Sequence, residues 1–159
     1  MKKFELTAEF VTNVFGKKLF RIKALVAFGN VEKGELGGFI EKEDNLSHDG
    51  DAWVFGNAQV FGNAQVSGNA RVYGNAWVYG NAQVSDDADY AVVKGFGRCF
   101  RTTTFFRCKD KILRVQCGCF YGDLAQFREI VKKTHGDSKY AKEYLAIADL
   151  MELHFSDEY

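Results

Sequence analysis

The chain has 159 residues, 47% of them hydrophobic, which suits one domain with a sizeable core and excludes general disorder. Lys plus Arg number 21 and Asp plus Glu number 21, so the net charge is zero and points to no class of partner. No run approaches the roughly 18 apolar residues of a membrane span, and Glu5 and Glu9 interrupt what would be a signal peptide. We therefore expect a soluble, cytoplasmic protein with no membrane partner.

Residues 1–34 contain two stretches in which apolar and polar residues alternate, at 3–6 (KFEL) and 19–25 (LFRIKAL). This alternation predicts β-strands. The repeat that follows them would leave an unpaired strand edge at its first coil, and such an edge needs a cover. We therefore predict that residues 1–34 form a β cap.

A six-residue repeat begins at Asp51 and reads DAWVFG, NAQVFG, NAQVSG, NARVYG, NAWVYG and NAQVSD, before it degrades in DADYAV. In one hexad Ala58 and Val60 point to one face while Gln59 and Phe61 point to the other. Gly and Asn adopt positive φ at low cost, so a Gly-Asn pair every six residues bends the chain in the same way each time. The pattern predicts a coil with Ala and Val inside.

The hexads resemble those of left-handed parallel β-helices, in which three hexads complete one triangular coil. The resemblance implies that Val54 stacks on Val72, Val60 on Val78 and Val66 on Val84, and it alone supplies the left-handedness. Leu36, Phe39, Ile40 and Leu46 indicate an irregular first coil. We predict a mainly β fold with a short hexapeptide-repeat β-helix over residues 35–92.

Two sides of this triangle carry outward aromatic residues, whereas the third carries Gln and Ser. The aromatic set comprises Trp53, Phe55, Phe61, Tyr73, Trp77 and Tyr79. Exposed apolar patches of that size are unusual on a monomer, so something must cover them. Three candidates could cover these aromatic residues: the chain's own tail, sister subunits in a homo-oligomer that we expect to be a trimer, and a host protein.

The sequence of the tail, residues 93–159, predicts a β-hairpin followed by two helices. Strands at 104–108 and 112–119 flank a Lys-Asp-Lys turn. Asp123 is placed to cap a helix that ends before Gly136, and a second helix should run from about Ser138 to His154.

Four cysteines lie in the tail with the spacing C-x8-C-x8-C-x-C, which lacks the paired C-x2-C units of zinc sites. Strand alternation places Cys108 beside Phe106, and Cys117 and Cys119 beside Val115, on apolar faces. We interpret all four as free thiols, of which Cys108, Cys117 and Cys119 pack in the core, and expect neither a metal nor a cofactor.

Residues 94–114 carry seven basic side chains and one acidic one, interleaved with phenylalanines. Guanidinium groups near aromatic rings and hydroxyls suit phosphate and base contacts. The candidate anion-binding residues are Arg98, Arg101, Thr102, Thr103, Thr104 and Arg107. A nucleotide or nucleic acid is one possible partner, and neutralisation of the protein's own acidic coil is the alternative.

Over nearly its full length the chain resembles a group of phage and prophage proteins with a β segment, hexads and a ββαα tail. The likeness is carried by 36–41 (LGGFIE), 45–48 (NLSH), the hexads, 103–106 (TTFF), 117–120 (CGCF) and 135–136 (HG). Such proteins carry labels such as transferase or polymer-forming protein. The resemblance implies a non-catalytic, oligomeric accessory protein that inhibits a host defence system through a protein or a nucleotide.

Two alternatives stay open. Trimeric β-helices of this type include acyltransferases that use acyl-coenzyme A and a histidine base, and His48 is then the candidate. The hexads contain no inserted loop that would build an acceptor pocket, so we expect no catalysis and no catalytic residue. The other alternative is a structural module that assembles with itself.

Overall fold

The Ala and Val positions of the repeat line one continuous interior. Within the computed structural model, which describes residues 2–156, three pairs of short strands form the sides of the coil. They are β4 (Trp53–Val54) with β7 (Arg71–Val72), β5 (Gln59–Val60) with β8 (Trp77–Val78), and β6 (Gln65–Val66) with β9 (Gln83–Val84). All three pairs are parallel.

The predicted stacking is confirmed, because Val54 pairs with Val72, Val60 with Val78 and Val66 with Val84. These valines and the alanines of the same hexads are buried in one cluster. The corner glycines from Gly56 to Gly80 have φ between 60° and 67°, the region that glycine enters without a steric penalty. The chain therefore turns at each corner, and the side-chain period of two keeps the same positions inside.

An N-terminal hairpin closes the first coil. It consists of β1 (Phe4–Thr12) and β2 (Lys18–Ala24), and β2 pairs antiparallel with β3 (Leu36–Ile40) of the first coil. Because β3 also pairs with β5, the sheet order is β1-β2-β3-β5-β8. A short 3-10 turn, η1 (Glu43–Asn45), follows β3. The predicted cap does cover the free edge of the first coil.

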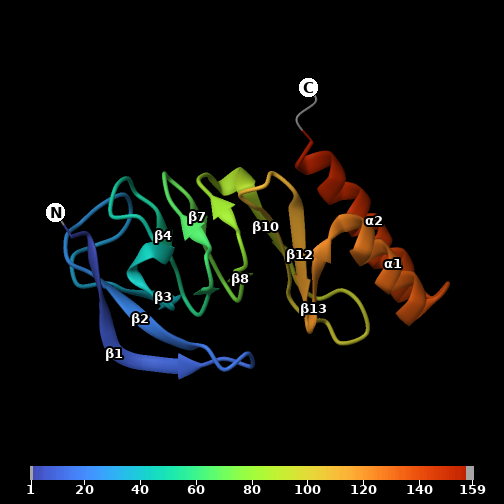
Figure 1. The fold of residues 1–159 in the computed structure, drawn as a ribbon, viewed down its shortest axis with the longest axis horizontal. Helices are drawn as coiled ribbons and strands as arrows, with labels where there is room; N and C mark the ends of the chain where they lie inside the picture. The colour runs from blue at the N-terminus through green and yellow to red at the C-terminus, as the bar shows by residue number, and fades with distance from the viewer. Residues whose placement is uncertain (1, 157–159) are drawn as a thin grey trace.

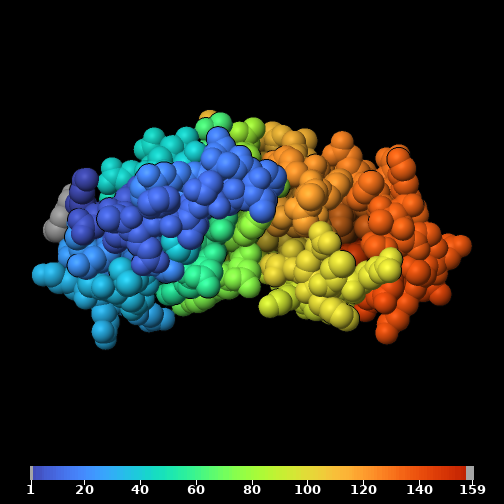
Figure 2. Space-filling model, turned by 90° about the horizontal axis from the view of Figure 1, so that it is seen from below, coloured from blue at the N-terminus to red at the C-terminus, as the bar shows by residue number. Residues whose placement is uncertain are grey.

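The hairpin also extends sideways along the coil, which the sequence did not indicate. Its side chain Phe15 lies 5.7 Å from Tyr79 and 6.0 Å from Phe61, measured between ring centroids. Figure 2 shows the blue hairpin lying along the coils, with its tip beside the C-terminal part of the chain. The N-terminal segment is therefore both an end cap and a lateral cover.

The tail closes the last coil with a four-stranded antiparallel sheet. The turn η2 (Asp87–Asp89) leads into β10 (Tyr90–Val93), and β11 (Thr103–Arg107), β12 (Leu113–Cys117) and β13 (Phe120–Asp123) follow in that order. The β11–β12 hairpin is as predicted. The sequence predicted one strand over residues 112–119, whereas the structure has two. Strand β12 ends at Cys117, and Gly118, at φ 60°, turns the chain into β13.

Two helices cover the outer face of this sheet (Figure 1). Asp123 accepts a hydrogen bond from the amide of Gln126 at the start of α1 (Leu124–His135), and Gly136 ends that helix. Ser138 caps α2 (Lys139–His154). These caps confirm the predicted helix ends, and the two helices bury a second core with Phe105, Val115 and Phe127.

The four cysteines are free thiols, but they do not share one environment. Cys108 is buried, Cys117 is half-buried, and Cys99 and Cys119 are exposed. The expectation for Cys119 is wrong because it lies in the turn between β12 and β13 and not on an apolar strand face.

Candidate functional site

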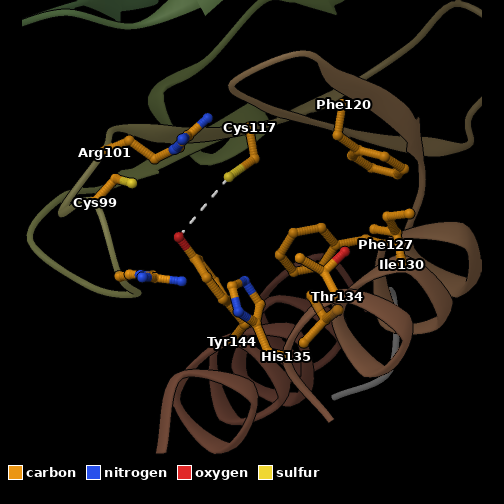
Figure 3. Close-up of a pocket in the computed structure, with 11 residues that line it drawn as sticks. Cys99, Arg101, Cys117, Phe120, Phe127, Ile130, Thr134, His135 and Tyr144 are labelled. Atoms are coloured by element: carbon orange, nitrogen blue, oxygen red, sulfur yellow. Dashed lines mark hydrogen bonds between the residues drawn. The ribbon is translucent and has the colours of Figure 1, made fainter. Parts of the chain in front are cut away.

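A cavity of about 340 Å³ opens where the loop before β11 faces the two helices. Its apolar part is built by Phe120, Phe127, Ile130 and Val131, and its polar part by Arg98, Cys99, Arg101, Cys117, Thr134, His135 and Tyr144. Figure 3 shows Arg101, Cys99 and Cys117 on one side of the cavity and the labelled helix residues on the other. Its volume lies near the lower end of the range for small-molecule sites.

The loop of residues 94–101 is held against α2 by two hydrogen bonds. The amide of Gly97 donates to Glu143 Oε1 at 3.2 Å, and the hydroxyl of Tyr144 donates to the carbonyl of Phe96 at 3.3 Å. Gly97 has φ 77°, and a Cβ there would overlap the Tyr144 hydroxyl. The loop therefore reaches this close approach only with glycine at position 97.

The mouth of the cavity is positively charged. Arg98 and Arg101 are exposed, and neither forms an ion pair with a carboxylate among residues 2–156. The lining contains no Asp or Glu side chain. The pKa of the Arg101 guanidinium is raised, chiefly by a hydrogen bond to the Cys99 side chain. Two guanidinium groups beside an apolar floor suit a ligand with an anionic end and an apolar body.

Tyr144 supplies a neutral polar group inside the cavity. Burial raises the pKa of Tyr144 to about 12, so its hydroxyl stays protonated at neutral pH. The Cys117 thiol lies 4.0 Å from this hydroxyl, as the dashed line in Figure 3 marks. The His135 ring packs against Tyr144 with 5.8 Å between centroids, which brings the end of α1 to the cavity.

The six candidate anion-binding residues do not lie together. Arg98 and Arg101 line the cavity, and Thr102 is half-buried beside it in sequence. Thr103 and Thr104 are fully buried: the Thr103 hydroxyl donates to Cys117 Sγ, and the Thr104 hydroxyl accepts from the amide of Trp77. The structure therefore contradicts the expectation that these two hydroxyls are open to an anion.

Arg107 lies away from the cavity. Its Nε is 3.2 Å from Asp89 Oδ1, and its guanidinium lies 5.3 Å from the Phe155 ring centroid. Asp89 belongs to the acidic end of the coil, so for Arg107 the structure supports the alternative of internal charge neutralisation. Arg107 is thus separated from Arg98 and Arg101, and its part in anion binding stays a prediction.

The six outward aromatic residues are mostly covered by the chain itself. Trp53 is 0% exposed beneath Phe28, and Phe61 is 3% exposed beneath the hairpin. Trp77, Tyr79 and Phe55 are half-buried, which leaves Tyr73 as the exposed member, at 47%. Trp53 and Phe61 are thus not contact surfaces, and the main cover is the N-terminal hairpin together with Tyr121 of β13.

His48 is poorly arranged for a general base. Its Nδ1 accepts the Lys3 amide at 3.0 Å, its ring stacks on Phe4 at 4.2 Å, and its Nε2 lies 3.6 Å from Glu43 Oε1. In the neutral ring the nitrogen that accepts a hydrogen bond is the one with the lone pair. That lone pair is occupied, so the ring has no nitrogen ready to take a proton from a substrate.

Sequence reasoning missed His135, Tyr144 and Phe127 as members of the site. The sequence signal for the cavity is the Gly-rich, basic stretch 94–101 (KGFGRCFR), which marks the loop but not its opposite wall. Among residues 2–156, no group of three or more His, Cys, Asp or Glu side chains is placed to hold a metal ion. Nor does any helix in this part of the chain have the length and apolar character needed to cross a membrane.

Comparison with known proteins supports the class of fold and little more. A family model described as the YdcK beta solenoid repeat matches residues 64–80. These residues include the third side of the first full coil and the first two sides of the next, so the match agrees with a β-solenoid. No curated protein matches the chain.

Proposed function

We propose that this β-solenoid protein is a non-catalytic binding protein whose cavity beneath the 94–101 loop takes a small anionic ligand with an aromatic or apolar body. The single observation that carries the proposal is the pairing of Arg98 and Arg101 above an apolar floor, without a carboxylate in the lining. A mononucleotide has the matching chemistry, because it joins a phosphate to a flat base.

We further propose that the coil is a left-handed, hexapeptide-repeat helix and that the protein is a phage accessory protein. Its ligand is a nucleotide signal of a host defence system, which the protein sequesters. We also propose that the protein forms a homotrimer; of the six outward aromatic residues Tyr73 is exposed, and Phe55, Trp77 and Tyr79 are half-buried. Acyl transfer is disfavoured because the lone pair of His48 is engaged by Lys3.

The test is calorimetric titration of the full chain with adenosine 5′-monophosphate and, separately, with adenosine. We expect the monophosphate to bind much more tightly than adenosine, and its binding to weaken with added salt because the phosphate charge carries it. Arg101→Gln should weaken binding about 10- to 100-fold, the range for a lost charge-assisted hydrogen bond. Arg101→Lys keeps the charge and should lose less.

Arg114→Gln is the matched control. It removes the same charge, but Arg114 pairs with Asp110 in the β11–β12 turn and does not line the cavity. Its affinity should equal that of the wild type. If Arg114→Gln weakened binding as much as Arg101→Gln, the effect would come from the net charge of the protein and not from the cavity. If adenosine bound as tightly as its monophosphate, the proposed anion site would be refuted.

A further inference from the structure

Two columns of stacked rings follow the coils, and they end differently. In one column Phe61 stacks on Tyr79 with centroids 4.7 Å apart and planes at 4°, and Tyr121 of β13 lies against Tyr79 at 4.9 Å. In the other column Phe55 stacks on Tyr73 at 4.4 Å and 10°. Among residues 2–156, no third ring packs on Tyr73. The molecule thus completes one column and leaves the other open.

The open end of the second column has a physical cause in the sequence. Three hexads beyond Tyr73 the chain has Ala91, which carries no ring and packs toward the helical core from β10. A hollow of about 400 Å³ lies there, lined by Arg71, Tyr73, Gly74, Asp87, Tyr90, Ala91 and Val92. Tyr73 forms an exposed wall of this hollow.

The rim of the hollow offers one donor group and one acceptor group. The Arg71 side chain lines the hollow together with Tyr73, and Asp87 Oδ1 accepts the Arg71 amide at 2.8 Å. The Tyr90 hydroxyl is engaged with the backbone of Arg71. Because Arg71 and Asp87 carry opposite charges, the rim has no net charge and does not select an ion. It suits a neutral ring with both N–H and C=O groups at its edge.

We propose that the hollow over Tyr73 binds a flat, uncharged heteroaromatic ring of the purine type, which completes the Phe55–Tyr73 column as Tyr121 completes the other. Guanine matches the rim well. Its O6 and N7 atoms accept from a guanidinium, and its N–H groups donate to a carboxylate. This site is separate from the arginine cavity and does not depend on it.

Guanosine is the probe, because it has no phosphate for the arginine cavity to bind. Titration of the full chain with guanosine should show binding, both by saturation-transfer NMR and by calorimetry. Tyr73→Ala should weaken it about 5- to 150-fold, the range for loss of one base–aromatic stack. Tyr73→Phe keeps the ring and should retain most of the affinity. Arg101→Gln should leave guanosine binding unchanged, which separates this site from the proposed anion site.

A second variant tests the hollow without removing the Tyr73 ring, in case Tyr73→Ala disturbs the fold. Val92 lines the hollow from β10 and is itself partly exposed, so Val92→Trp should fill the hollow with a ring and block guanosine while thermal melting stays cooperative. Absence of guanosine binding at millimolar concentration would overturn the proposal. So would binding that survives Tyr73→Ala, or wild-type self-association that Tyr73→Ala abolishes, since a second copy would then cover the ring.

Discussion

Phe55 and Phe61 occupy the same position in successive hexads, yet the structure gives them different costs of truncation. Phe61 is 3% exposed and packs against Leu19, Phe39 and Tyr79, so Phe61→Ala should lower the free energy of unfolding by about 3–5 kcal/mol. Phe55 is half-buried beside the exposed Tyr73, and water can fill the space it leaves. Phe55→Ala should therefore cost only about 1–2 kcal/mol.

Urea unfolding followed by circular dichroism measures both values, and equal m-values would show that the variants expose similar surface. The reasoning rests on the lateral cover by the hairpin, so it can be tested further at Phe15. The Phe15→Ala and Phe61→Ala pair should show a coupling of about 0.5–1.5 kcal/mol in a double-mutant cycle. Losses at Phe55 and Phe61 within 0.5 kcal/mol of each other (roughly the error of such cycles), or zero coupling, would refute the cover.

Three further predictions concern the coil. Burial raises the pKa of the Cys108 thiol from 9.0 to about 11, so the folded chain keeps a proton that the unfolded chain loses. Stability should fall between pH 9 and 11 by up to about 2.7 kcal/mol, and Cys108→Ala should flatten that part of a urea-unfolding series. Gly68→Ala should lower the melting temperature more than Gly74→Ala: both positions have positive φ, but the new Cβ overlaps the Ser85 carbonyl only at position 68, which adds about 1–3 kcal/mol. Asn45→Ala should cost about 2–3 kcal/mol in chemical denaturation, because the buried amide accepts two backbone N–H groups and donates to two carbonyls; a loss below about 0.5 kcal/mol would contradict that network.

The coil could be predicted from the sequence because its determinants are local. Each hexad determines which residues point inward and where the chain turns. Because three hexads form one coil, residues 18 positions apart pair, as Val60 does with Val78. The helix ends were equally local, since Asp123 and Ser138 cap their helices through residues three positions away. Each of these predictions needed no knowledge of what lies across the molecule.

The covers could not be predicted because they join residues that are far apart in sequence. Trp53 has the same outward position as Gln65, and only the fold places Phe28 and Phe4 over its ring. Strand β13 was missed for a related reason. Cys117 and Cys119 were assigned to one strand by alternation, whereas Gly118 turns the chain between them.

The candidate site shows the same division between local and long-range information. A run of basic residues is visible in the sequence, but alternation within β11 separates its members. Thr104 and Phe106 face the coil, whereas Thr103, Phe105 and Arg107 face the helical side. Arg98 and Arg101 lie in the loop before the strand, and of the basic residues in this run they are the ones that line the cavity.

The cavity follows from the need to close the last coil. Phe106 and Cys108 of the closing segment are buried with the valines of the repeat, so the other face of the same sheet presents Phe105 and Val115, which also require burial. Helices α1 and α2 supply it, and the loop between β10 and β11 passes over their edge and leaves a space there. The proposed anion site is therefore built entirely from the tail, and the coil supports it without contributing a residue to its lining. Because each coil contacts chiefly its neighbours, a chain with one coil more or fewer would keep this cavity unchanged.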